Sequence, residues 1–259
     1  MNMTRFVRRK LHGPRITIGH KSEVLRLGSE YGGWVFVPNE SLKGATILSC
    51  GLGEDASFDV EIAKLYGARV VIVDPTPRAI QHFNAIMARM GHPRVSEYSQ
   101  DGCQPIESYD LSGLNSDQFS LVQAALSDGN GVAKFFSPPD SSSVSYSLVN
   151  FQNNYSSTTP FIKVPTMDIA TLVSRESLSQ IALAKFDIEG AEIQVIPLML
   201  ANEIFPDQIL VEYDELNFPS ARGRKNFNSV NQLLIGAGYS TTWFDGRSCV
   251  SYRLSAPRK

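Results

Sequence analysis

Acidic side chains gather after two apolar, strand-like stretches of this sequence. The first stretch leads into Asp187, Glu189 and Glu192, and the second leads into Glu212 and Asp214. Because alternate residues of a strand point to the same side, Asp187 shares a side with Glu189, and Glu212 shares one with Asp214. If the two strands are parallel neighbours, these carboxylates face one crevice at the carboxyl ends of the strands, where ligands bind in open α/β sheets. The spacing therefore predicts a site for proton transfer or ligand binding.

Two glycines mark a second candidate site, nearer the start of the chain. The apolar run Thr46–Cys50 has the length of a strand, and Gly51 and Gly53 follow it at once. A helical pattern comes next, and the valine-rich run 70–73 then ends on Asp74. Glycines let a ligand approach the backbone, and an acid at the second strand tip accepts hydrogen bonds from ribose hydroxyls. This unit of strand, turn, helix and strand predicts a nucleoside site.

Two classes of nucleoside ligand fit the glycine turn. The spacing satisfies the dinucleotide pattern, with Asp74 about 20 residues further on, which keeps an NAD site open. A pyrophosphate, however, must sit at the helix N-terminus, where Glu54 and Asp55 would repel it. S-adenosylmethionine carries no phosphate, and its cationic sulfonium and ammonium groups tolerate nearby acids. The two acids could also do no more than complement the helix dipole. The turn therefore favours the methyl donor without deciding the question.

The composition describes an ordinary globular protein and excludes several classes. The chain has 259 residues, enough for one large α/β domain or two small ones, and 42% of them are hydrophobic. A net charge of −2 gives no field that would attract nucleic acid or a membrane surface. The three cysteines are widely separated and form no disulfide framework or metal motif, which suits a reducing cytosol. Since no apolar run reaches transmembrane length, we expect a soluble, cytoplasmic protein.

Hydrophobic periodicity and turn residues predict the elements that surround the two sites. Helices are expected over residues 77–90, 192–201 and around 230–234, the strands 119–126 and 132–136 as one hairpin, and the strands 239–244 and 248–252 as another. Pro197 lies inside the second of these helices and is expected to kink or shorten it. A terminal antiparallel hairpin after a run of strand–helix units is unusual for NAD domains.

Two long irregular segments, 92–117 and 137–160, are candidates for loops that set substrate specificity. The second is either a low-complexity linker or a mobile loop whose hydroxyls, such as that of Ser145, contact a ligand. We expect residues 1–40 to form a basic arm and an edge strand, and residues 41–259 to form a single domain. The arm either touches phosphorylated groups or is a solvated leader, which is the simpler interpretation.

Several of these stretches resemble, in order and spacing, the FkbM-type S-adenosylmethionine-dependent methyltransferases. The matching stretches are Tyr31-Gly32-Gly33-Trp34, Gly51-Leu52-Gly53-Glu54-Asp55, Asp74-Pro75, Ala124-Ala125-Leu126-Ser127-Asp128, Lys185-Phe186-Asp187-Ile188-Glu189-Gly190-Ala191-Glu192 and Val211-Glu212. The resemblance implies an α/β fold: a Rossmann-like, seven-stranded class I methyltransferase sheet with helices on both faces and a C-terminal antiparallel hairpin. It also implies methylation of a hydroxyl on a sugar or small natural product, with S-adenosyl-L-methionine as cofactor.

The resemblance places the cofactor against the glycine turn and the neighbouring strand tips. The candidate contacts are Gly51, Gly53, Glu54, Asp55, Asp74, Pro75, Ala125 and Asp187. Many relatives carry an acid at the end of the first strand, where this chain has Ser49-Cys50. The contact to the methionine ammonium is therefore assigned to Glu54, Asp55 or Asp187. Relatives also tend to have a histidine where this chain has Asp214, so a histidine base is absent from that position.

Methyl transfer to a hydroxyl requires the oxygen to be held in line with the methyl group and its proton to be removed. We expect Asp187 to be the base, with Glu212 or Asp214 as alternatives. Glu189 and Glu192 are expected to orient substrate hydroxyls or to cap the following helix. The carboxylates could instead hold a divalent cation, but Glu212-x-Asp214 is the one tight ligand spacing, so we expect no metal.

Two other functions stay open. An NAD-linked oxidoreductase would use the glycine pattern and Asp74, but it leaves the run 185–192 and the terminal hairpin unexplained. A non-catalytic binding protein with a methyltransferase fold would account for the missing acid and the missing histidine. For the methyltransferase, we expect a small-molecule or carbohydrate acceptor and no nucleic acid partner; nothing in the sequence indicates an oligomeric state.

Overall fold

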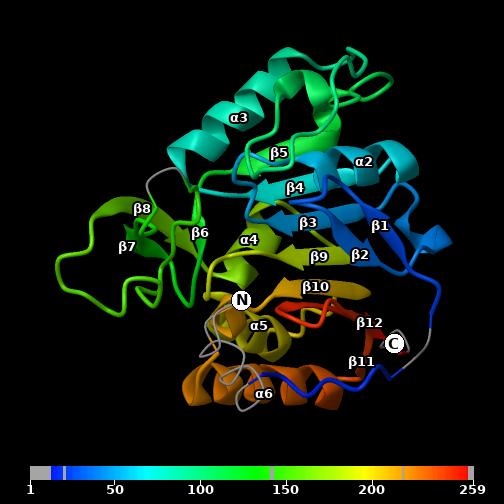
Figure 1. Ribbon diagram of the computed structural model, residues 1–259. Coiled ribbons are helices and arrows are strands. Elements are labelled where there is room, and N and C mark those ends of the chain that lie inside the picture. Colours follow the sequence, from blue (N-terminus) through cyan, green and yellow to red (C-terminus); the bar gives the residue numbers. More distant parts are fainter. Residues whose placement is uncertain (1–12, 20–21, 141–142, 218, 256–259) are drawn as a thin grey trace.

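A seven-stranded sheet, in the order β11-β12-β10-β9-β3-β4-β5, forms the centre of the computed structural model, which describes residues 13–19, 22–140, 143–217 and 219–255 (Figure 1). The strands are β3 (Thr46–Cys50), β4 (Arg69–Val73), β5 (Phe119–Val122), β9 (Leu183–Phe186), β10 (Gln208–Glu212), β11 (Tyr239–Phe244) and β12 (Cys249–Leu254). Neighbours from β5 to β10 are parallel, whereas β12 runs antiparallel to both β10 and β11. The predicted α/β class, central sheet and C-terminal hairpin are confirmed.

Helices connect the parallel strands, as the apolar periodicity predicts. They are α2 (Ser57–Tyr66), α3 (Pro77–Ala88), α4 (Ile169–Arg175), α5 (Glu192–Ala201) and α6 (Ala221–Gly236). α2 ends at Gly67, whose φ of 61° is a left-handed conformation that glycine adopts without strain. Pro77 is the first residue of α3. Because the N–H group at this position has no partner within a helix, proline loses no hydrogen bond here. Among the described residues, no helix is both long enough and apolar enough to cross a membrane.

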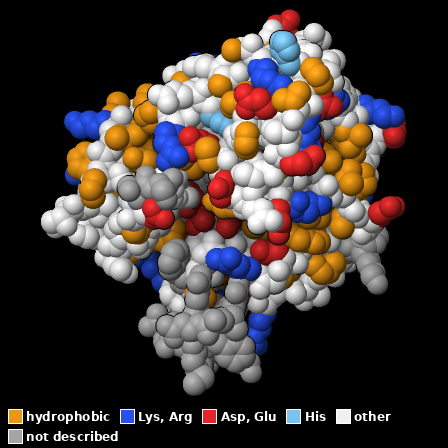
Figure 2. Space-filling view, turned by 45° about the horizontal axis from the view of Figure 1, so that its top comes forward, with side chains coloured by type: hydrophobic (Ala, Val, Ile, Leu, Met, Phe, Trp, Pro, Cys, Tyr) orange, Lys and Arg blue, Asp and Glu red, His pale blue; other side chains and the backbone are white. Residues whose placement is uncertain are grey.

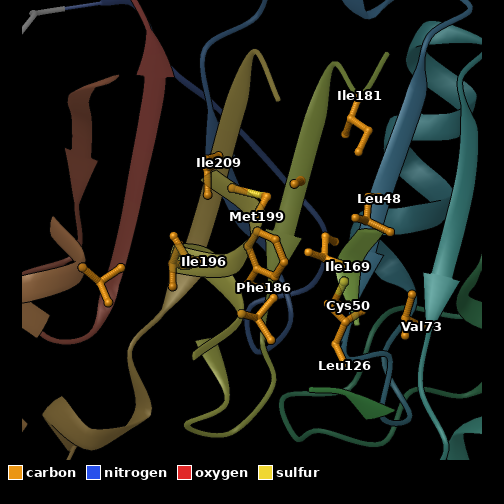
Figure 3. Close-up of a cluster of buried hydrophobic side chains, with 14 of the residues drawn as sticks. Leu48, Cys50, Val73, Leu126, Ile169, Ile181, Phe186, Ile196, Met199 and Ile209 are labelled. Carbon is orange, nitrogen blue, oxygen red and sulfur yellow. The ribbon is translucent and has the colours of Figure 1, made fainter. Parts of the chain in front are cut away.

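The core lies on both faces of the sheet because alternate strand residues point in opposite directions. On one face, Leu48, Phe186 and Ile209 from three adjacent strands pack with Ile196 and Met199 of α5 (Figure 3). On the other face, the strand residues between them pack against α2, α3 and β2 (Trp34–Phe36). Each fully buried aliphatic or aromatic side chain contributes about 1.5–3 kcal/mol, so this two-sided burial fixes the strand register.

A second, three-stranded sheet lies beside the carboxyl ends of the main strands (Figure 1). It consists of β6 (Ala125–Leu126), β8 (Phe161–Met167) and β7 (Gly131–Phe136), in that order. The predicted hairpin of 119–126 with 132–136 is therefore wrong. The chain leaves the main sheet after Val122, and β8 lies between β6 and β7, pairing with β7 over six positions. Hydrogen bonding to this long, later strand replaces the short-range pairing that the turn residues favour.

The N-terminal segment lies across one face of the main sheet. β1 (Leu25–Leu27) pairs with β2, whose three residues are all buried. Two hydrogen bonds join the backbone of Val37 to the side chain of Gln208 at the start of β10. The strand-like run predicted around Trp34 is confirmed, and most of the predicted basic arm lies outside the described residues.

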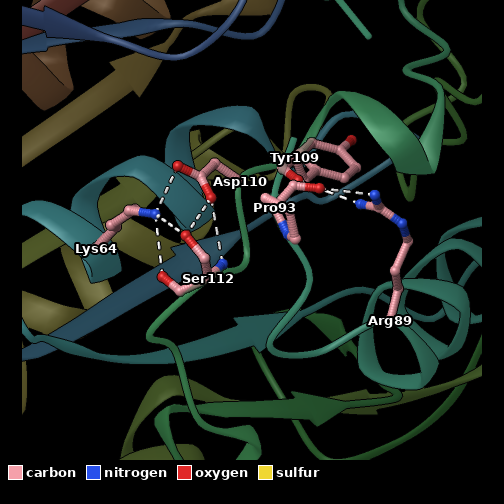
Figure 4. Close-up of polar contacts among 6 residues, drawn as sticks. All are labelled: Lys64, Arg89, Pro93, Tyr109, Asp110 and Ser112. Carbon is pink, nitrogen blue, oxygen red and sulfur yellow. Dashed lines mark hydrogen bonds and ion pairs between the residues drawn. The ribbon is translucent and has the colours of Figure 1, made fainter. Parts of the chain in front are cut away.

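The irregular segment 92–117 is anchored to two helices (Figure 4). Its short helical turns are η2 (Ile106–Ser108) and η3 (Ser116–Gln118), whereas η1 (Glu40–Leu42) and η4 (Asp214–Asn217) lie elsewhere in the chain. Lys64 of α2 forms an ion pair with Asp110 at 2.6 Å and donates to the backbone oxygen of Ser112 at 3.0 Å. Arg89, the C-cap residue of α3, donates to the Pro93 oxygen at 2.8 Å. These contacts indicate a structural role for most of the segment.

Candidate active site

A cavity of about 920 Å³ opens at the carboxyl ends of β3, β4, β9 and β10. Figure 2 shows acidic side chains gathered in a hollow of the surface on this side of the molecule. Every predicted site residue except Glu192 lines the cavity. The predicted meeting of the carboxylates required their two strands to be parallel neighbours. β9 and β10 are parallel neighbours, with Val211 opposite Phe186.

The glycine turn forms one wall of the cavity and tolerates no side chain at its first position. Gly51 has φ of 89°, and a Cβ atom there would lie 1.8 Å from the backbone oxygen of Asp187. Lys185 donates a hydrogen bond from Nζ to the Gly51 oxygen at 2.6 Å. The turn after β3 is thus held directly against the end of β9, which explains why a glycine is needed at this point.

Asp74 holds the same turn from the other side. Its Oδ2 accepts hydrogen bonds from the backbone N–H groups of Leu52 at 2.9 Å and Gly53 at 3.0 Å. Its Oδ1 accepts from the backbone N–H of Thr76 at 2.8 Å and from the Thr76 hydroxyl at 2.7 Å. An ionised carboxylate offers about four lone-pair positions, and all are taken. A ribose hydroxyl would therefore have to share or displace one of these donors.

The two acids of the turn also have partners within the protein. Asp55 accepts from the backbone N–H of Ser57, the first residue of α2, at 2.9 Å, and from the hydroxyl of Ser29. Glu54 forms an ion pair with Arg78. The N-terminus of α2 therefore already holds a carboxylate, as the helix-dipole interpretation requires. A pyrophosphate at this position would meet a filled and negatively charged helix end.

Asp187 and Glu212 extend side by side from the ends of β9 and β10. Burial and the charge of Glu212 raise the pKa of Asp187 well above its usual range, and the nearby Lys185 opposes the shift. Glu212 Oε1 accepts from the side-chain amide of Asn217 at 3.0 Å and from the hydroxyl of Ser248 at 3.2 Å. A raised pKa makes the ionised form of Asp187 a stronger base, so Asp187 is a candidate proton acceptor.

Glu189 is held in place by the segment between β7 and β8. Its backbone is left-handed, with φ of 54°, which is strained for a residue other than glycine. Gln152 donates to Glu189 Oε2 at 2.9 Å, the hydroxyl of Ser145 also contacts the carboxylate, and Ser147 donates to the Glu189 backbone oxygen. Burial chiefly raises the pKa of Glu189 to about 7, with the Ser145 contact acting in the opposite direction. The segment 137–160 thus lines the site.

Asp214 and Glu192 differ in where their carboxyl groups lie. Asp214 is 6% exposed and lines the cavity, and burial together with neighbouring acids raises its pKa well above the usual range. Glu192 is fully buried outside the cavity lining, and its Oε2 accepts from the backbone N–H of Gly190 at 2.8 Å. For Glu192 this geometry fits the capping role and gives no contact with a substrate.

Several cavity residues were not predicted from the sequence. They include Tyr31, Gln152, Trp243 and Ser248. Trp243 lies near the end of β11 and Ser248 in the turn before β12, and the antiparallel pairing of Cys249 with Glu212 brings this end of the hairpin to the carboxyl end of β10. The sequence indicates the hairpin but not its neighbour, so this wall of the cavity could not be foreseen.

Within the described part of the chain, no group of three or more histidine, cysteine, aspartate or glutamate side chains is arranged to hold a metal ion. The acids of the cavity instead contact hydroxyl, amide and backbone N–H donors, or one another. The arrangement therefore suits proton transfer and the binding of neutral or cationic molecules.

Comparison with known families gives a match that covers most of the chain. The family model of the FkbM methyltransferase domain matches residues 22–241, from just before β1 into β11. All the predicted site residues lie within this range. A search of curated proteins gave no match. On the strength of the family match, this chain belongs to the FkbM methyltransferase family.

Proposed function

We propose that this protein transfers the methyl group of S-adenosyl-L-methionine to a hydroxyl of a sugar or another small natural product. Membership of a methyltransferase family is the starting point. The observation that supports the finer statement is that the glycine turn and the carboxylates of β9 and β10 line one cavity. One side of the cavity is suited to a nucleoside and the other to a polar acceptor. Transfer of a group requires both molecules to be held next to each other in this way.

The donor side fits S-adenosylmethionine better than a dinucleotide. Gly51 and Gly53 line the cavity, and Pro75 and Ala125 line the adjoining wall. The filled N-terminus of α2 disfavours a pyrophosphate, whereas the acids around it complement a cationic ligand. We place the methionine ammonium near Asp187, at the boundary of the two sides. When bound, the cofactor supplies an electrophilic methyl group on a positively charged sulfur.

The acceptor side supplies the groups that position a hydroxyl and take its proton. Asp187 is the proposed base because it lies beside the donor turn and next to Glu212. Glu212 and Asp214 are the alternative bases, and Glu189 and Ser145 are proposed to orient the acceptor. A positioned base contributes about 10²- to 10⁴-fold to such a reaction, and the in-line geometry contributes the rest.

Calorimetric titration tests the donor half of the proposal directly. We expect S-adenosylhomocysteine to bind and NADH not to bind. Binding of NADH with no binding of S-adenosylhomocysteine would favour the oxidoreductase instead. The second half needs a transfer assay with methyl-labelled donor and a panel of sugars and hydroxylated natural products. Binding of the donor with no transfer to any member of the panel would favour a non-catalytic binding protein.

A further inference from the structure

Tyr31 is a large aromatic side chain that lines the cavity and is 62% exposed. Its ring lies against Gly102, where a Cβ atom would come within 2.8 Å of two ring carbons and 3.1 Å of the hydroxyl oxygen. The lack of a side chain at Gly102 therefore gives the ring its place. The hydroxyl of Tyr31 forms no hydrogen bond with any residue in the described ranges, so it is open to contact with a ligand.

The loop that carries Tyr31 is held firmly on both sides of it. Before Tyr31, Arg26 donates from Nη2 to the backbone oxygen of Ser29 at 2.6 Å, and the Ser29 hydroxyl donates to Asp55. After Tyr31, the backbone N–H of Gly32 donates to the Ser29 hydroxyl at 2.8 Å, and a Cβ atom on Gly32 would lie 2.6 Å from the Asp55 carboxylate. The loop thus presents an exposed tyrosine from a fixed backbone, as a binding residue requires.

The hydroxyl of Tyr31 lies near the acids at the carboxyl ends of the strands. Partial burial, and then the charges of Asp187, Glu189 and Glu212, raise the pKa of Tyr31. Asp187 and Glu189 follow β9, and Glu212 ends β10. A phenol with a raised pKa stays protonated at neutral pH, so Tyr31 offers an uncharged O–H donor at a place where the other side chains are chiefly acceptors.

The proposed methyl donor has a group that needs such a hydrogen-bond donor. Its methionine end carries an ammonium and a carboxylate on the same carbon atom. Because the proposed function places the ammonium near Asp187, the carboxylate must lie in the same part of the cavity, among acids that repel it. A carboxylate taken out of water there loses free energy unless a hydrogen-bond donor meets it.

The three basic side chains of the cavity lining are engaged elsewhere or lie further away. Lys185 is 3% exposed and donates from Nζ to the backbone oxygen of Gly51 at 2.6 Å. Arg26 donates to backbone oxygens of its own loop. Arg247 belongs to the turn of the terminal hairpin, which β10 separates from β9 and from Asp187. The O–H group of Tyr31 is the exposed donor that remains near Asp187.

We propose that Tyr31 donates a hydrogen bond from its hydroxyl to the carboxylate of the bound methyl donor, and so positions the methionine end of that donor. This inference rests on the proposed function and adds a binding residue to it. The ammonium and the carboxylate of the donor are then held by different segments: Asp187 at the end of β9 takes the first, and the loop before β2 takes the second. Two such contacts fix the direction of the carbon chain that leads to the sulfur and its methyl group.

Titration calorimetry with two ligands tests this contact at pH 7. S-adenosylhomocysteine carries the carboxylate, whereas its decarboxylated form lacks that group and keeps the ammonium. Tyr31→Phe removes only the hydroxyl, so it should weaken the binding of S-adenosylhomocysteine by about tenfold and leave the affinity for the decarboxylated form unchanged. Tyr155→Phe is the matched control, because Tyr155 is 50% exposed and lies outside the cavity lining, and it should retain both affinities.

The outcomes separate this inference from the proposed function. If S-adenosylhomocysteine does not bind to the unmodified protein, the proposed function fails and the role of Tyr31 fails with it. If it binds, and Tyr31→Phe keeps its affinity or loses affinity for both ligands alike, the inference is overturned while the donor assignment stands. The same loss in Tyr155→Phe would also overturn it. Because the Tyr31 side chain is exposed, the substitution should not disturb the fold, and circular dichroism checks this.

Discussion

The carboxylates on the two sides of the cavity are built in opposite ways. On the proposed donor side, Asp55 and Asp74 are saturated with hydrogen bonds from the backbone and from hydroxyls, and they fix the turn after β3 and the start of α2. On the proposed acceptor side, Glu189 and Asp214 face each other and further acids, with few donors. The difference supports the proposal that the first pair of acids shapes the protein, whereas the second pair serves a ligand or a proton.

The largest effect is expected at the boundary of the two sides, where Asp187 lies. If Asp187 is the base, Asp187→Asn removes proton acceptance and lowers turnover by about 10²- to 10⁴-fold. The neutral isostere also relieves the repulsion from Glu212, so the fold should not lose stability. Turnover with methyl-labelled donor is the measurement, with circular dichroism to confirm folding. Near-normal transfer would move the role of base to Glu212 or Asp214.

A smaller effect is expected on the donor side, from Asp74→Ala. The change removes the acceptor for the N–H groups of Leu52 and Gly53, so the turn loses its shape and any ribose contact is lost as well. Affinity for S-adenosylhomocysteine should fall by about 10- to 100-fold, since an unmade hydrogen bond at a buried group costs about 1–3 kcal/mol. Titration calorimetry measures the loss. Unchanged affinity would show that Asp74 neither shapes nor contacts the donor site.

The sequence predicts the glycine turn and the acid beside it well because their signals are local. Gly51, Gly53 and Asp74 lie within one strand–helix–strand unit, and the periodicity of that unit fixes how its parts meet. The acids after β9 and β10 are also predictable, given that parallel strands end at the same edge of the sheet. These patterns sufficed to bring all but Glu192 of the predicted site residues to one cavity.

Features that depend on distant pairing could not be predicted. The turn residues 127–131 favour a local hairpin, but β8, about 30 residues later, forms the hydrogen bonds instead. Likewise, Trp243 reaches the cavity only because β12 pairs with β10. Both oxygens of Asp74 accept hydrogen bonds, whereas Oδ2 of Asp214 has no partner among the described residues, and this difference depends on donors from other segments. The sequence shows the acid but not its partners.

The contrast between the two sides also predicts a dependence of stability on pH. The folded-state pKa of Glu189, about 7, lies above its ordinary value of 4.5, so the fold disfavours the charged form. The stability that the neutral form provides is complete below pH 4.5 and is lost as the pH rises through 7. Glu189→Gln avoids this loss and should gain about 1–3 kcal/mol over the unmodified protein at pH 8, but nothing at pH 4.

Urea unfolding of both proteins at pH 4, 6 and 8 measures this gain. Glu97→Gln is the matched control, because the Glu97 side chain is 92% exposed and should show no such dependence. A Glu189→Gln variant that is equally or less stable than the unmodified protein at pH 8 would contradict the prediction. The acids of the acceptor side would then be as well satisfied as those of the donor side.

The smallest effect is expected at Asp110, an acid satisfied like those of the donor side but outside the cavity. Hydrogen bonds from Lys64 and Ser112 lower its pKa to about 2 (Figure 4). Its stabilising contribution is therefore present above the ordinary value of 3.8 and is lost as the pH falls through 2. Because the side chain is 43% exposed, solvent screening limits the contribution to below about 1 kcal/mol.

Asp110→Asn should thus lower the unfolding free energy slightly at pH 7 and leave the affinity for S-adenosylhomocysteine unchanged. A double-mutant cycle with Lys64→Met isolates the ion pair from other effects of the substitution. A loss of donor affinity in Asp110→Asn would show that the segment 92–117 reaches the site through its anchors on α2 and α3. Asp110 would then belong to neither group of acids, because it would affect the donor site without lining the cavity.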